Sequence, residues 1–143
     1  MKTIAQFLSE HNRSVHAVSV DTNVRQALEL MAEKNIGALV VLEGQHLVGM
    51  FSERDYARKV ALKGKSSVDT LVGDIMTAEV ISMKAGQSMT ECMQTMTDHH
   101  IRHLPVLDEQ RQLLGLISIG DVVREILQEQ SNTIEQLKSY IAN

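Results

Sequence analysis

Residues 49–55 read Gly49-Met50-Phe51-Ser52-Glu53-Arg54-Asp55, and residues 115–121 read Gly115-Leu116-Ile117-Ser118-Ile119-Gly120-Asp121. Both segments place a serine three residues after a glycine and an aspartate three residues after that serine. Two apolar residues separate the glycine from the serine, as expected where a buried strand ends. The segments lie 66 residues apart, which indicates that the chain contains two copies of one structural unit.

The similarity between the copies extends upstream from this motif. Residues 27–31, Ala-Leu-x-x-Met, correspond to residues 92–96, Cys-Met-x-x-Met, at a separation of 65 residues. Ile36-x-x-Leu39 corresponds to Ile101-x-x-Leu104 at the same separation. The change from 65 to 66 residues falls in a turn, where one inserted residue costs little stability. The copies therefore cover about residues 16–62 and 79–128.

Hydrophobic periodicity predicts the same elements in each copy. Val24, Ala27, Leu28 and Met31 form one face of a helix, and residues 89, 92, 93 and 96 repeat this stripe. Two short apolar runs joined by a polar turn then predict adjacent strands, and a second helix begins at each motif serine. A short strand is expected before each first helix, at residues 16–20 and 80–83, so the unit is β-α-β-β-α.

The predicted fold is an α/β protein in which two such repeats pack about a pseudo-two-fold axis. Each repeat is close to the lower size limit for an independent core, and their packing is expected to leave a cleft with two related sites. We divide the chain into an N-terminal helix (1–12), a first repeat (13–68), a second repeat (69–130) and a C-terminal helix (131–143). The apolar stripe Ile134, Leu137 and Ile141 in the last helix needs a surface to pack on, either a second chain or the other repeat.

Composition narrows the functional classes. The chain has 143 residues, a formal net charge of -4 and 3% aromatic residues, so it lacks the basic surface and the stacking side chains of nucleic-acid-binding proteins. Its apolar runs are shorter than the roughly 20 residues that cross a bilayer, and its first residues do not resemble a secretory signal. The single cysteine, Cys92, cannot form an internal disulfide, which favours a cytoplasmic location.

The repeated serine and aspartate have two chemical interpretations. A serine at a strand end can cap the next helix, and an acid three residues later can complete a capping box. Capping boxes usually use Glu or Gln at that position, and Asp is expected to be too short to close the box well. A carboxylate there can accept hydrogen bonds from two neighbouring hydroxyls, as in ribose recognition. The glycine, which lacks a side chain, is expected to leave room for the ligand.

With these motifs, and with Ile75-Met76-Thr77 and the segment Ile101-Arg102-His103-Leu104-Pro105-Val106, residues 13–130 resemble a tandem pair of cystathionine-β-synthase (CBS) domains, often called a Bateman module. The resemblance implies a regulatory module, not an enzyme, that binds AMP, ADP, ATP, NAD or S-adenosylmethionine between its repeats and has no catalytic cofactor. It also implies a homodimer, commonly a flat disc of four repeats, and a regulated partner protein whose identity the sequence does not show.

The resemblance further implies which residues form each site. Asp55 and Asp121 would hold the ribose diol, with Ser52 and Ser118 close to ribose or phosphate. Each adenine slot would come from the other repeat: Thr77, Val80, Ile81 and Ile101 at the Asp55 site, and Ser14, His16, Val18, Ile36, Gly37 and Ala38 at the Asp121 site. Arg102 and His103 would face phosphates, while Arg54, Arg58 and Lys59 would compensate in the first repeat. Arg58 and Lys59 fit a solvated helix face equally well. Because the sites are unequally charged, they are expected to differ in ligand or occupancy.

Other functions have weaker support in the sequence. His99, His100 and His103 suggest a metal, but the repeat alignment places them across a helix end and a strand, without an acid at zinc-site spacing. Cys92 lies on an apolar stripe, so a buried, inert thiol is expected there. Two alternatives remain: a dimerisation scaffold with an empty cleft that docks on an enzyme or transporter, and a nucleotide hydrolase without a recognisable base.

Overall fold

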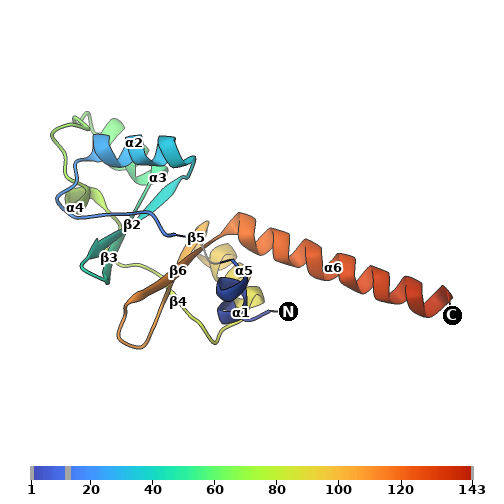
Figure 1. Cartoon of the computed structure of the whole chain (residues 1–143). Helices are drawn as coiled ribbons and strands as arrows, with labels where there is room; N and C mark the ends of the chain where they lie inside the picture. The colour runs from blue at the N-terminus through green and yellow to red at the C-terminus, as the bar shows by residue number, and fades with distance from the viewer. Residues whose placement is uncertain (1, 12–13, 143) are drawn as a thin grey trace.

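Two three-stranded sheets, one in each repeat, form the framework of the fold in the computed structural model, which describes residues 2–11 and 14–142 (Figure 1). In the first sheet, β1 (Ala17–Val18) pairs in parallel with β2 (Ala38–Glu43), which pairs in antiparallel with β3 (His46–Ser52). In the second sheet, β4 (Met83–Lys84), β5 (His103–Leu107) and β6 (Leu113–Ser118) repeat this order and pairing. The register shifts at equivalent points, between Val41 and Leu42 and between Val106 and Leu107. The duplication predicted from the sequence therefore extends to the strand register.

The first helix of each repeat packs on its sheet. The helices α2 (Val24–Lys34) and α5 (Met89–His99) begin after the side-chain caps Asn23 and Ser88, and end before a residue in the left-handed region with a φ of 54°. Their buried residues are Val24, Ala27 and Met31 in α2, and Met89, Cys92 and Met96 in α5. The stripe is narrower than the sequence predicts, because Leu28 is only partly buried and Met93 is 36% exposed.

The helices that follow the two motifs differ between the repeats. In the first repeat, α3 (Glu53–Tyr56) continues into one turn of π-helix, η1 (Ala57–Ala61). In the second repeat, α6 (Ile119–Ala142) is a single helix of 24 residues, where the sequence suggested two helices divided near residue 131. Within the described residues, no helix combines the length and the apolar character that are needed to span a lipid bilayer.

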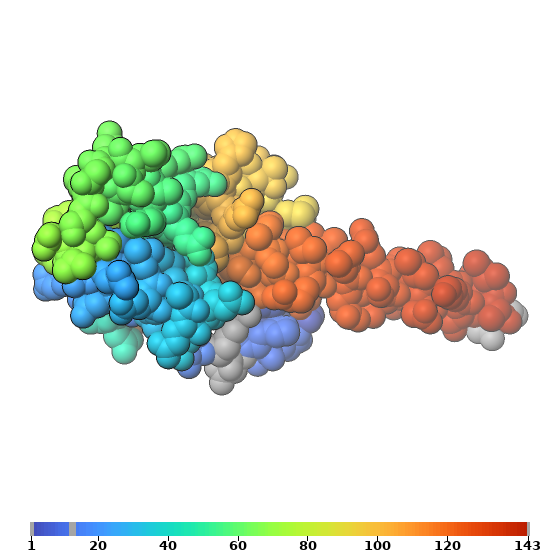
Figure 2. Space-filling view, turned by 90° about the horizontal axis from the view of Figure 1, so that it is seen from above, coloured from blue at the N-terminus to red at the C-terminus, as the bar shows by residue number. Residues whose placement is uncertain are grey.

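The far half of α6 extends well beyond the rest of the molecule (Figures 1 and 2). Ile134, Leu137 and Ile141 on this segment are 52%, 56% and 82% exposed. The other repeat therefore does not cover this apolar stripe, which excludes one of the two alternatives given by the sequence. A second chain remains as the covering surface proposed from the sequence.

Each repeat is completed by a segment that lies outside its β-α-β-β-α unit. The N-terminal helix α1 (Ile4–Glu10) buries Ile4 and Phe7 in the core of the second repeat. The backbone N–H of Ile4 donates to the carbonyl of Gln87 at 2.8 Å, next to the start of α5. Conversely, α4 (Val72–Ile75), which precedes the β-α-β-β-α unit of the second repeat, buries both of its terminal residues in the core of the first repeat. The two repeats are therefore linked by more than their shared interface.

The repeats meet through equivalent surfaces. Val40, Leu47 and Leu107 form an apolar cluster between the sheets, with Met50 and Leu116 packed against it. His46 and Gln112 occupy equivalent positions in the repeat alignment, and they pair with each other in an isolated antiparallel bridge. A residue contacts its own equivalent only close to a two-fold axis. This bridge therefore marks the pseudo-two-fold axis of the tandem repeat.

Candidate functional site

Two clefts lie between the repeats, and each contains one motif aspartate. The cleft that contains Asp55, here the Asp55 cleft, has a volume of about 480 Å³, and the Asp121 cleft has a volume of about 380 Å³. Both volumes suit a small organic ligand. The Asp55 cleft is lined by the predicted residues Ser52, Arg54 and Asp55 of the first repeat and Thr77, Val80, Ile81, Ile101, Arg102 and His103 from the other half of the chain. The Asp121 cleft is lined by the predicted residues Ser118, Asp121 and His103, together with Ser14, His16, Ile36 and Ala38.

Four predicted residues lie elsewhere, and one of them, Lys59, lines neither cleft. Val18 in β1 packs against the core of the first repeat instead of lining a cleft. Arg58 lies exposed in the π-helical turn and lines neither cleft, in agreement with the solvated helix face considered as its alternative. Gly37 lines the Asp55 cleft, whereas the resemblance had placed it at the Asp121 site.

Asp55 is held through both of its carboxylate oxygens. Its Oδ2 accepts hydrogen bonds from the backbone N–H and the hydroxyl of Ser52, at 3.0 and 3.1 Å. Its Oδ1 accepts a hydrogen bond from the Thr77 hydroxyl at 3.1 Å and lies 3.0 Å from the Lys59 ammonium. Because Thr77 belongs to the segment that enters the second repeat, this buried carboxylate joins the two walls of its cleft.

Asp121 has an equivalent arrangement in the second repeat. Its Oδ2 accepts a hydrogen bond from the backbone N–H of Ser118 at 2.8 Å, and the Ser118 hydroxyl accepts one from the backbone N–H of Asp121 at 3.2 Å. Its Oδ1 lies 2.8 Å from Nη2 of Arg124. In both repeats, therefore, one carboxylate oxygen caps the helix and the other faces a cation from the next helical turn.

Both aspartates complete a hydrogen-bonded cap, so the expectation that aspartate is too short was wrong. The carboxylates reach the N-cap amides of Ser52 and Ser118 at 3.0 and 2.8 Å. This cap satisfies a backbone N–H at the point where a strand becomes a helix. The cap uses Oδ2, while Oδ1 contacts Thr77 and Lys59 at Asp55 and Arg124 at Asp121. A ligand that binds Oδ1 would therefore share this oxygen with these partners or displace them.

The motif glycines serve chain packing. A Cβ atom built at Gly49 would lie 2.5 Å from Sδ of Met76 and 3.1 Å from the carbonyl oxygen of Thr77. A Cβ atom at Gly115 would lie 2.7 Å from Cδ2 of Leu8. The space that each glycine leaves is occupied by the segment that completes its repeat or enters the next one. Gly49 lines neither cleft, so the expectation that it leaves room for a ligand is not met there, whereas Gly115 does line the Asp121 cleft.

The cations on the aspartates were the main residues that sequence reasoning misjudged. Arg58 and Arg124 are equivalent in the repeat alignment, each three residues after the aspartate. In the regular helix α6, Arg124 contacts Asp121. In the first repeat the π-helical turn interrupts the equivalence, and Lys59, four residues after Asp55, makes the contact and also donates to the carbonyl of Ile75 at 3.0 Å. The sequence signal for these contacts is a basic residue three or four positions after the aspartate, because side chains at that spacing are neighbours on a helix.

The two clefts carry different charges. The Asp55 cleft contains the cations of Arg54 and Arg102 and also the carboxylates of Glu53 and Glu79, which the sequence analysis did not include. Nη1 of Arg54 donates to the carbonyl of His100 at 3.2 Å, across the interface between the repeats.

The Asp121 cleft is lined by three imidazoles, from His11, His16 and His103. Burial lowers the pKa of His103, Arg102 also lowers it, and the nearby carboxylates of Asp121 and Glu53 oppose this shift. A neutral imidazole at pH 7 follows for His103.

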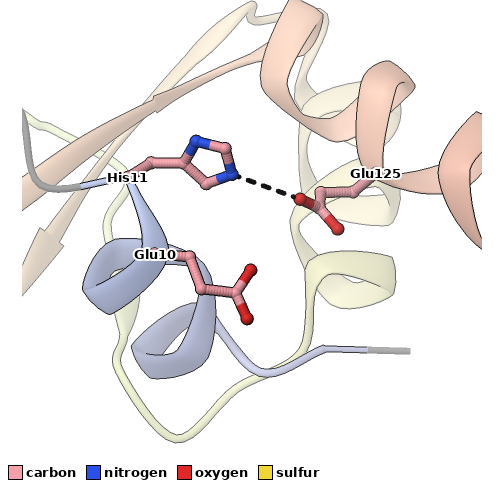
Figure 3. Close-up of side chains that lie close together, drawn as sticks. All are labelled: Glu10, His11 and Glu125. Carbon is pink, nitrogen blue, oxygen red and sulfur yellow. Dashed lines mark ion pairs between the residues drawn. The ribbon is translucent and has the colours of Figure 1, made fainter.

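A polar cluster, drawn in Figure 3, shares His11 with the lining of the Asp121 cleft. Glu10, His11 and Glu125 bring one ligand atom each to within 4.8 Å of the others, and Nε2 of His11 lies 3.5 Å from Oε1 of Glu125. The Lys2 ammonium pairs with Glu10 and lies 3.2 Å from Oε2 of Glu125. Because the Lys2 ammonium pairs with both carboxylates, we interpret the cluster as an ion-pair network that ties α1 to α6.

The histidines considered as metal ligands have separate structural positions. His99 is the last residue of α5, His100 is its left-handed C-cap, and His103 begins β5. Helical spacing therefore does not relate them. His103 instead lines both nucleotide-sized clefts.

Comparisons with known proteins agree with the duplicated fold. The CBS domain family model matches residues 6–62 and 72–128. A protein with CBS domains from Burkholderia ambifaria MC40-6 is 48% identical with a TM-score of 0.84, over 90% of this chain and 96% of that one. The CBS domain-containing protein CBSX3, mitochondrial, of Arabidopsis thaliana is 42% identical over 128 residues, which are 86% of this chain and 62% of that protein.

The structure of CBSX2 in complex with AMP is also similar. It is 28% identical with a TM-score of 0.77, over 91% of this chain and 99% of that one. The family match covers both repeats, and the sheets, the motif serines and the motif aspartates recur in each repeat. The chain therefore belongs to the CBS-domain family and contains a tandem pair of CBS domains.

Proposed function

We propose that this CBS-domain pair binds an adenine nucleotide (AMP, ADP, ATP or NAD) between its repeats and transmits its bound state to a partner protein. The observation that carries the proposal is the duplicated carboxylate: each cleft contains a buried aspartate that is fixed by a helix cap and opposed by a wall from the other half of the chain. Such a carboxylate accepts hydrogen bonds from a ribose diol.

The rest of the Asp55 cleft has groups for the remaining parts of a nucleotide. Val80, Ile81 and Ile101 supply an apolar surface of the kind that covers a purine ring. Arg54 and Arg102 supply guanidinium groups, which bind phosphate oxygens in bidentate fashion. The AMP complex of CBSX2 supports an adenine nucleotide as the ligand class.

We propose a regulatory role without catalysis. Both oxygens of Asp55 are committed to hydrogen bonds and an ion pair, which leaves this carboxylate poorly placed as a general base. Cys92 is buried, and burial raises the pKa of its thiol to about 11, so a nucleophilic thiolate is disfavoured. An unpaired cysteine also fits a reducing compartment, and we propose the cytoplasm.

A scaffold is the second candidate function, and the exposed stripe on α6 favours it. Ile134, Leu137 and Ile141 follow the spacing of three and four residues that is typical of a two-helix seam. We propose that this stripe pairs with a second copy of the chain in a homodimer. A scaffold in this sense would dimerise with its clefts empty, whereas the regulatory module would dimerise and also bind nucleotide.

Isothermal titration calorimetry with AMP, ATP and NAD distinguishes the two functions. The wild-type chain is compared with the variants Asp55→Asn and Asp121→Asn, which keep a side-chain oxygen for the helix cap, and with the exposed control Asp69→Asn. We expect binding of at least one nucleotide, loss of binding at one cleft in each site variant and unchanged binding in the control. Absence of heat with all three nucleotides would favour the scaffold.

A further inference from the structure

His103 borders both clefts. It is the first residue of β5, and it lines the Asp55 cleft and the Asp121 cleft. Its equivalent in the first repeat is Ala38, the first residue of β2, which also lines both clefts. The two positions have the same register, because Ala38 pairs with Ser52 and His103 pairs with Ser118. The pseudo-two-fold symmetry thus places one alanine and one histidine where the two clefts adjoin.

Charged and titratable side chains share both clefts with His103. In the Asp121 cleft it shares the lining with Asp121, whose Oδ1 pairs with Arg124, and with the imidazoles of His11 and His16.

In the Asp55 cleft it shares the lining with the cations Arg54 and Arg102 and with the carboxylates Glu53, Asp55 and Glu79. Burial and Arg102 disfavour the imidazolium, while Asp121 and Glu53 favour it, and the pKa is lowered in sum. Without a ligand, His103 is therefore neutral at pH 7 and able to gain a proton.

We propose that the His103 imidazole takes up a proton from the buffer when an anionic phosphate enters either cleft, and that the resulting imidazolium favours an anion in the other cleft. This inference rests on the proposed nucleotide binding. An added negative charge close to an imidazole favours its charged form. Thermodynamic linkage then requires that protonation strengthens the binding of each anion by the same factor by which that anion strengthens protonation.

The coupling between the two clefts therefore depends on pH. It is strongest at pH values at which His103 is neutral in the free protein. It disappears at lower pH, because the imidazole is then protonated before any nucleotide binds. Proton uptake is larger for the first nucleotide bound than for the second, because one imidazole serves both clefts.

The test is calorimetric titration of AMP at pH 7 in buffers that differ in ionisation enthalpy, which yields the number of protons taken up. Asp55→Asn leaves only the Asp121 cleft able to bind AMP, and Asp121→Asn leaves only the Asp55 cleft. Each of these single-cleft variants is measured alone and in combination with His103→Gln. His99→Gln, an exposed histidine outside both clefts, is the matched control. His103→Ala is a second variant, because the first repeat carries Ala38 at the equivalent position.

We expect AMP binding to take up a fraction of a proton in both single-cleft variants, and loss of this uptake in both when His103 is replaced. The His99→Gln control retains the uptake. AMP binding without proton uptake would overturn the inference, as would loss of uptake in only one of the two single-cleft variants. Absence of AMP binding to the wild-type chain would instead overturn the proposed function, and with it the inference.

Discussion

Nη2 of Arg124 lies 2.8 Å from Oδ1 of Asp121, although the aspartate side chain is 2% exposed and the arginine side chain is 71% exposed. Both residues belong to the first turns of α6, the helix that extends beyond the body of the protein (Figure 1). A ligand that engages Oδ1 of Asp121 would share this oxygen with Arg124 or displace it, so binding would change the partners of an α6 side chain.

The Arg124→Gln substitution is expected to destabilise the chain by about 1 kcal/mol at low salt, because it leaves a buried carboxylate with fewer partners. Urea unfolding at two salt concentrations measures this, and the difference from the wild-type chain should shrink at high salt. The control is Lys138→Gln, whose exposed pair with Glu135 spans 3.7 Å and should contribute close to nothing. Equal effects of the two substitutions would contradict the role given to Arg124.

The Gly49→Ala substitution is expected to destabilise the chain by about 1–3 kcal/mol, because the added Cβ overlaps Met76 and the backbone carbonyl of Thr77. Gly115→Ala should cost less, since its new contact is the end of the flexible Leu8 side chain. Thermal and urea unfolding measure both values. Gly86→Ala, where a Cβ meets nothing within 4 Å, is the control and should be close to neutral; a neutral Gly49→Ala would contradict the packing described.

Unliganded stability is expected to fall as the pH drops below about 6.5. Burial lowers the pKa of His103 in the folded chain from its ordinary value of 6.5, so the unfolded chain binds the proton more readily. The contribution of neutral His103 to the free energy of unfolding is fully present above pH 6.5. It is lost as the pH falls toward the pKa of His103 in the folded chain. Urea unfolding at pH 7.5 and 5.5 should show a smaller difference in His103→Gln than in the wild-type chain, while His99→Gln should match the wild type. If His103→Gln keeps the full pH dependence of the wild-type chain, His103 is not the source of that dependence.

The Leu137→Glu substitution is expected to dissociate the proposed homodimer, because it places a charge in the centre of the α6 stripe. Light scattering after gel filtration should change from twice the chain mass of 15.9 kDa to a single chain mass. Ser139→Glu adds the same charge to an exposed position off the stripe of the same helix and should leave the dimer intact. A monomeric wild-type chain, or a dimeric Leu137→Glu variant, would contradict the assignment of this surface.

The sequence predicts the repeated sheets well because the hydrophobic pattern that specifies each element is local and occurs in both copies. The apolar runs around Val40 and Val106 and the helix stripes around Ala27 and Cys92 predict strands and helices through their periodicity. The alignment of the two copies also brings Asp55 and Asp121 into equivalent positions, and this equivalence survives in their hydrogen bonds.

Other features depend on long-range packing that periodicity does not encode. The amphipathic helix around Phe7 carries no local sign that it packs on the second repeat. The π-helical turn that replaces Arg58 by Lys59 at Asp55 has no local sequence signal that we recognise. The position of His103 between two clefts follows only once the repeats are placed about their axis.

The central claim is that the motif carboxylates hold a ribose, and a crystal structure of the chain with AMP tests it most directly. We expect AMP between the repeats, with the ribose O2′ and O3′ hydroxyls within about 2.5–3.0 Å of Oδ1 of Asp55 or Asp121. AMP bound elsewhere on the protein, or clefts without AMP at saturating concentration, would contradict the claim.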